Sequence, residues 1–121
     1  MPLFYRLTYH NPADADDLRS QAELGKVRPR SLSEEDWAGV SVFDSAQAAA
    51  DQRQWTYEAT GRNLGDFIAE LDIPPGVEVR QQGSDRHHYV VWQPAQQLLG
   101  YVTHTAPVLP LEPPAVEEDG D

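Results

Sequence analysis

The densest group of potentially reactive side chains is a pair of neighbouring histidines, His87 and His88, followed by Tyr89. The run from 86 to 92 is otherwise typical of a β-strand, and neighbouring strand residues point to opposite faces of a sheet. The two imidazoles therefore cannot act as one two-pronged ligand or as one acid/base couple. Positions 88, 90 and 92 form the more apolar set, so we expect His88 to face the core and His87 to be exposed.

An exposed His87 would share its face of the strand with Tyr89. An imidazole that titrates near neutral pH, beside a phenol, suits acid/base catalysis or ligand binding. These two residues are the candidate catalytic pair, and the alternative is an ordinary surface histidine next to a tyrosine. We predict no metal site, because the histidines at 10, 87 and 104 and the aspartate at 85 lack the short spacings of a metal-binding motif.

Three further residues could hold an anionic ligand. Arg6 lies among the apolar residues of a predicted strand, where a guanidinium can bind a phosphate or carboxylate through two hydrogen bonds, and the alternative is an internal ion pair. Ser41 is either a ligand contact or an ordinary strand residue. Ser45 is either a ligand contact or the N-cap of the alanine-rich helix that follows it.

The order of the helices and strands that must position these residues predicts an α+β fold. Two early helices are expected to pack on mostly antiparallel strands, because the helices come early and the strands cluster late. The first helix is expected to begin at Asn11-Pro12, which supplies an N-cap and a proline at the first helical position. The predicted strands are 3–9, 38–43, 67–73, 77–80, 86–92 and 101–104, and the predicted helices are 12–24, 46–55 and 94–99.

Length and composition predict one domain. The chain has 121 residues, of which 40% are hydrophobic. We assign residues 1–105 to an α+β domain and residues 106–121 to a proline-rich acidic tail that is expected to be disordered. The chain has no cysteine, which excludes disulfides, thiolate metal sites and cysteine nucleophiles.

The net charge limits the classes of partner that we expect the chain to bind. Nine Lys and Arg residues stand against 20 Asp and Glu residues, a net charge of -11. Without a basic stripe, such a surface argues against binding nucleic acid or an anionic membrane and favours a basic protein partner. No apolar run is long enough to span a bilayer, and the N-terminus lacks the basic and apolar regions of a signal peptide, so we expect a cytoplasmic location. The sequence assigns no oligomeric state.

Residues 40–45, Val-Ser-Val-Phe-Asp-Ser, precede an alanine-rich helix. This segment resembles the strand and helix that carry the serine motif in ADP-ribosyltransferase-like folds, which include the RES-domain toxins. The opening strand with Arg6, and the strand, proline turn and strand at 68–79, extend the resemblance. It implies a nucleotide site in which Arg6 holds a nicotinamide dinucleotide (NAD), with Ser41 or Ser45 beside it.

The late strand departs from this family. Many members carry a glutamate there, which stabilises the positive charge that develops on the ribose as nicotinamide leaves. The corresponding strand, 87–92, has no glutamate, and a neutral imidazole at His87 cannot replace a carboxylate. The resemblance therefore implies a nucleotide-binding protein that has lost catalysis or retains it in altered form. The alternative is a non-catalytic interaction module of the immunity, antitoxin or phage-accessory type, with no small-molecule ligand.

Overall fold

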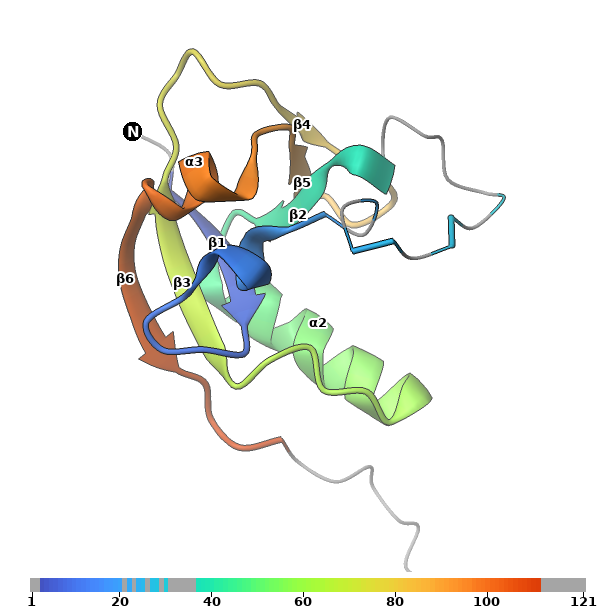
Figure 1. The fold of residues 1–121 in the computed structure, drawn as a ribbon. Helices are drawn as coiled ribbons and strands as arrows, with labels where there is room; N and C mark the ends of the chain where they lie inside the picture. Colours follow the sequence, from blue (N-terminus) through green and yellow to red (C-terminus); the bar gives the residue numbers. More distant parts are fainter. Residues whose placement is uncertain are drawn as a thin grey trace, which may run out of the picture.

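A computed structural model describes residues 3–20, 22, 24–25, 27–28, 30 and 37–111. Its strands form one antiparallel six-stranded sheet in the order β4-β5-β2-β1-β3-β6, which confirms an α+β domain (Figure 1). The elements are β1 Leu3–Thr8, the 3-10 helix η1 Ala15–Leu18, β2 Val40–Phe43, α2 Ala46–Thr60, β3 Phe67–Asp72, β4 Val79–Gln81, β5 His88–Val91, α3 Ala95–Leu99 and β6 Val102–Pro107.

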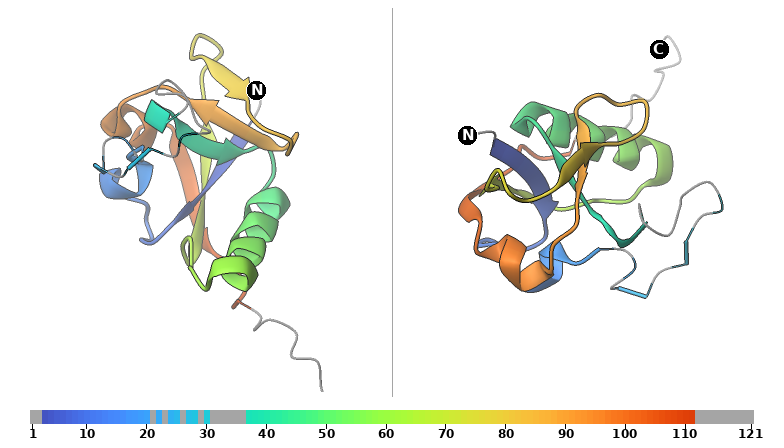
Figure 2. Two further views of the ribbon diagram at one scale, coloured as in Figure 1. Left: turned by 90° about the vertical axis from the view of Figure 1, so that its right-hand side faces the viewer. Right: turned by 90° about the horizontal axis from the view of Figure 1, so that it is seen from above.

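The sheet consists of two halves that meet at one residue pair. Strand β1 pairs with β3 along its whole length, from Leu3 to Thr8. Its pairing with β2 is limited to Tyr5 opposite Phe43. Beyond that pair the two strands diverge, so β4-β5-β2 forms one half and β1-β3-β6 the other (Figure 2). Side chains, and not backbone hydrogen bonds, must fill the gap between the diverging strands.

Each face of the sheet has its own core. The larger core lies under η1 and α3 and includes Phe4, Leu18 and Leu98. The smaller core lies under α2 and contains Leu7 and Ala49. This division follows from the alternation of strand side chains, which sends Phe4 to one face and Leu7 to the other.

The prediction of a helix over 12–24 is wrong for the described residues of that segment. Asp14, and not Asn11, is the N-cap: its carboxylate accepts a hydrogen bond from the Asp17 amide, and the Asp17 carboxylate accepts one from the Asp14 amide. This capping box starts a single 3-10 turn, which ends at Leu18 because Arg19 is extended. The expected two early helices are therefore one 3-10 turn and α2, while α3 comes late in the chain.

Helix α2 begins as predicted, at the N-cap Ser45, whose hydroxyl accepts a hydrogen bond from the Ala48 amide at 3.0 Å. It continues past the predicted end to Thr60, where Gly61 closes it with a φ of 75°, in the left-handed region that favours glycine. No helix in the described ranges is both long enough and apolar enough to cross a bilayer.

The predicted strands all have counterparts, and the main shift lies at the last one. Strand β6 includes residues 106 and 107, so the boundary expected between 105 and 106 falls inside the sheet. Val108 continues the ordered chain, because its amide donates to the Asp66 carbonyl at 2.9 Å. Residues 112–121, where most of the predicted acidic tail falls, lie outside the described residues.

Candidate functional site

A cavity of about 450 Å³ opens where β1 and β2 diverge. It falls within the size range of small-molecule sites. Its wall combines cationic, anionic and aromatic side chains. The residues on which the site depends are Arg6, Asp16, Asp17, Arg19, Ser41, Phe43, Arg62, Asp85 and His88.

Arg6 crosses the gap between the strands. Its Nε–H donates to the Asp17 carbonyl oxygen at 2.6 Å, and its Nη1 donates to the Ser41 carbonyl oxygen at 2.7 Å. These two bonds join β1 to η1 and to β2 at the point where strand pairing has ended. The guanidinium thus links β1 to β2 where backbone hydrogen bonds between the two strands are missing.

The Arg6 guanidinium retains donors for a ligand. An arginine side chain offers five N–H donors. Within the described part of the chain, Nη2 makes no hydrogen bond and no carboxylate lies within ion-pairing distance of the guanidinium. Burial lowers the pKa of Arg6 to about 10, against the opposing effect of the nearby Asp17 carboxylate, so the side chain stays cationic at neutral pH. A partly buried cation that no described carboxylate contacts directly therefore lines the cavity.

The Asp17 carbonyl is held in place by the turn at η1, in which two carboxylates and one imidazole interact with one another. The buried Asp17 carboxylate accepts from the Tyr9 amide at 2.8 Å, from the Asp14 amide at 3.1 Å and lies 3.0 Å from His10 Nδ1. Burial alone would raise the pKa of Asp17, but the two amide hydrogen bonds and His10 together lower it. The hydrogen bond with Asp17 in turn raises the pKa of His10.

The same turn offers a set of metal-ligating atoms that the sequence did not single out. Ligand atoms of His10, Asp14 and Asp17 all lie within 4.8 Å of one another. In this structure these atoms are each other's partners, with His10 Nδ1 at 3.1 Å from Asp14 Oδ2 and 3.0 Å from Asp17 Oδ2. They serve to close the turn.

His88, and not His87, lines the cavity. Its ring packs on Phe43, with the ring centroids 5.4 Å apart, because the two residues are paired across β2 and β5. Burial lowers the pKa of His88, which keeps the imidazole neutral at pH 7. The predicted inward position of His88 is confirmed. That this inward face borders the cavity could not be foreseen, because it depends on the divergence of β1 and β2.

The predicted pair of His87 and Tyr89 lies in two different surroundings. His87 is exposed, as predicted, and its Nδ1 lies 2.9 Å from Asp44 Oδ1 in a second cavity that also contains Ser45. Tyr89 packs on Phe4, with ring centroids 5.4 Å apart, beside the larger core. Of the predicted site residues, the structure brings Arg6 and Ser41 into one cavity and places the other three elsewhere.

Comparisons with known proteins assign no family. No protein-family model matches the chain, and no solved structure matches it. A segment of 77 residues is 32% identical to part of the molybdenum-binding subunit of an aldehyde oxidoreductase, PaoC, from Escherichia coli strains K12 and O157:H7. The match covers 63% of this chain and 10% of that subunit, so the chain spans about a tenth of the relative's length.

Proposed function

We propose that this chain is a small nucleotide-binding protein of ADP-ribosyltransferase-like type, which binds an NAD-like ligand in the cavity between β1 and β2. One observation carries the proposal: Arg6 presents unused guanidinium donors on the cavity wall and has no carboxylate partner among the described residues. A partly buried charge without a partner is unfavourable. A phosphate group would supply that partner through paired hydrogen bonds.

The rest of the cavity suits a nucleotide. Arg62 also lines it and can bind further phosphate oxygens, and Arg19, which is ion-paired with Asp16 at 3.2 Å, lies on the same wall. The packed rings of Phe43 and His88 offer an aromatic surface to a base or a nicotinamide ring. Asp85 is a carboxylate on the same wall, suited to accept hydrogen bonds from ribose hydroxyls.

The residues that line the cavity favour ligand binding over catalysis. The histidine that borders the cavity from β5 is His88, whose pKa is lowered by burial, and a neutral ring cannot stabilise a developing oxocarbenium ion. The carboxylate of Asp17 is already held by three hydrogen-bonding partners. The proposal is therefore a catalytically degenerate relative of the transferases, in which the fold is kept for ligand recognition.

A ligand titration tests the proposal. Thermal unfolding is followed with NAD, ADP-ribose and inorganic pyrophosphate, and affinities are measured by calorimetry. A ligand at about 100 times its dissociation constant should stabilise the fold by about 2.7 kcal/mol. We expect Arg6→Gln to weaken NAD binding more than tenfold, since it removes a charged, two-pronged donor.

Two further variants make the test specific. Arg62→Gln changes a well exposed residue of the cavity wall, is expected to fold normally, and should weaken binding severalfold. Arg80→Gln removes the same charge from an exposed position on β4 outside the cavity and should leave binding unchanged. No stabilisation by any of the three ligands, or equal affinity in wild type and Arg6→Gln, would overturn the proposal.

A further inference from the structure

A second cavity, of about 400 Å³, lies beside the first half of α2 and the segment that leads into β5. We call it the α2 groove. Helix α2 contributes an exposed tryptophan, Trp55, with 65% of its surface accessible. The other lining residues on which the inference depends are Gln47, Asp51, Asp85 and His87. The groove adjoins the nucleotide cavity, because Gln52 and Asp85 line both.

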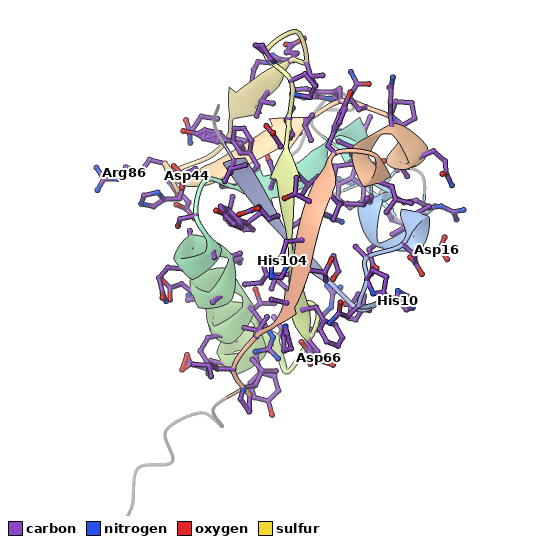
Figure 3. The ribbon with its side chains drawn as sticks, turned by 90° about the vertical axis from the view of Figure 1, so that its left-hand side faces the viewer. His10, Asp16, Asp44, Asp66, Arg86 and His104 are labelled. Atoms are coloured by element: carbon purple, nitrogen blue, oxygen red, sulfur yellow. The ribbon has the colours of Figure 1, made fainter. Side chains whose placement is uncertain are left out.

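The charge of the α2 groove is negative. Two carboxylates, Asp51 and Asp85, line it, and the described lining residues include no lysine or arginine. Asp44 lies at its border, 2.9 Å from the imidazole of His87. Arg86, between Asp85 and His87 in sequence, is exposed and extends away from the molecule beside Asp44 (Figure 3).

Both lining carboxylates have capacity for another donor. Asp51 Oδ1 accepts a hydrogen bond from Gln47 Nε2 at 2.8 Å, and Asp85 Oδ1 accepts one from the His87 amide at 2.9 Å. Their Oδ2 atoms make no hydrogen bond within the described residues. The groove thus combines an accessible indole with exposed carboxylate oxygens that no described residue occupies.

We propose that the α2 groove binds an arginine side chain of a basic protein partner. A guanidinium can stack on the face of an indole and at the same time donate to a carboxylate. A neutral apolar side chain would remove water from Asp51 and Asp85 without giving them a partner, which is unfavourable. The net charge of -11 steers a basic partner towards the molecule. This proposal does not depend on the proposed nucleotide function, although Asp85 lines both cavities.

A labelled peptide tests the proposal on the full chain. The probe is a fluorescein-labelled octapeptide of alternating arginine and glycine, and its binding is measured by fluorescence polarisation at 150 mM salt, where unspecific attraction is screened. We expect Trp55→Ala to weaken binding about fivefold or more, since it removes the stacking surface. Alanine favours helix, so this variant should retain α2, which far-ultraviolet circular dichroism checks.

A charge-matched pair of variants distinguishes binding in the groove from general electrostatic attraction to the protein. Asp51→Asn and Glu58→Gln each remove one negative charge from exposed positions of α2, but Glu58 does not line the groove. We expect Asp51→Asn to weaken binding severalfold and Glu58→Gln less than twofold. Equal losses in the two variants, unchanged binding by Trp55→Ala, or no binding of the peptide to wild type would overturn the proposal. Arg6→Gln should bind the peptide as wild type does, so loss of NAD binding and loss of peptide binding are distinguishable.

Discussion

Two arginines that point into the molecule have opposite environments. Arg53 on α2 is 4% exposed, and all three of its nitrogens are bonded: Nε to Gly65, Nη1 to the Leu109 carbonyl at 2.8 Å and Nη2 to the Asp66 carboxylate at 3.1 Å. Arg6 on β1 bonds to two carbonyl oxygens and has no carboxylate partner in the described part of the chain. The described part of the chain supplies partners for every nitrogen of Arg53, but it supplies no carboxylate partner for Arg6.

This difference separates a structural role from a binding role. Arg53 ties α2 to the segment before β3 and to the segment after β6. Arg6 also joins elements, but its unused donors line a cavity. A side chain whose N–H donors are all used within the protein cannot bind a ligand through them. An inward cation with unused donors can bind an anion, and the two arginines can be compared directly by mutation.

The largest effect is expected for Arg53→Met, a change that roughly preserves side-chain volume. It leaves two backbone carbonyls and the Asp66 carboxylate without their partner. Hydrogen bonds of a charged group contribute about 1.5–3 kcal/mol each, so we expect Arg53→Met to cost more than about 2 kcal/mol. Urea unfolding followed by circular dichroism measures this loss. A loss below about 1 kcal/mol would contradict the structural role of Arg53.

Arg6→Met should cost less stability, about 1–2 kcal/mol. The change removes two hydrogen bonds, but it also removes a partly buried cation that no described carboxylate contacts directly, and the second effect offsets part of the first. Urea unfolding under the conditions used for Arg53→Met gives the comparison. If Arg6→Met is as destabilising as Arg53→Met, Arg6 is mainly a structural residue and the contrast between the two arginines fails.

Local sequence patterns predicted the elements better than their arrangement. The N-cap at Ser45 and the strand that contains Arg6 follow from neighbouring residues, and both are confirmed. The helix expected over 12–24 failed because the reciprocal capping box of Asp14 and Asp17 starts the element at Ala15, and the extended backbone at Arg19 ends it after Leu18. Helical spacing of apolar residues could not show that early end.

The site depends on contacts that no local pattern contains. Strand alternation assigned the exposure of His87 and His88 correctly, but only the divergence of β1 from β2 decides that His88 borders a cavity. The role of Arg53 was not foreseeable either. It stands in an alanine-rich helix, and its acceptors lie 12, 13 and 56 residues away in sequence.

A smaller effect is expected for Asp66→Asn, which separates the ion pair of Arg53 from its backbone bonds. Asp66 is 62% exposed, so its salt bridge is screened by solvent and should contribute less than about 1 kcal/mol. Hydrogen bonds from Asn63 and then Arg53 lower the pKa of Asp66. A lowered carboxyl pKa contributes stability above its ordinary value of 3.8, and this contribution is lost as the pH falls through the lower folded value.

Urea midpoints of wild type and Asp66→Asn measure this at pH 7 and at about pH 2.5. The difference between the two proteins should be small at pH 7 and should shrink at the lower pH. A loss at pH 7 as large as that of Arg53→Met would mean that the ion pair, and not the carbonyl contacts, is the main bond of Arg53.

The smallest effect is expected at His10, which supports the Arg6 side of the comparison through Asp17. The hydrogen bond with Asp17 raises the pKa of His10 above its ordinary value of 6.5. A raised histidine pKa contributes stability that is complete below pH 6.5 and is lost as the pH rises through the folded value. His88 does not obscure this, because burial lowers its pKa and its titration falls below 6.5.

Urea unfolding of wild type and His10→Gln from about pH 6 to pH 9 measures the contribution. Wild type should lose a small amount of stability across this range relative to His10→Gln, whose side chain carries no charge. Because His10 holds the Asp17 carboxylate, and the Asp17 carbonyl holds Arg6, the same loss should loosen the Arg6 guanidinium. Parallel pH profiles for the two proteins would show that η1 is closed by its capping box alone and that Arg6 is oriented without help from the imidazole.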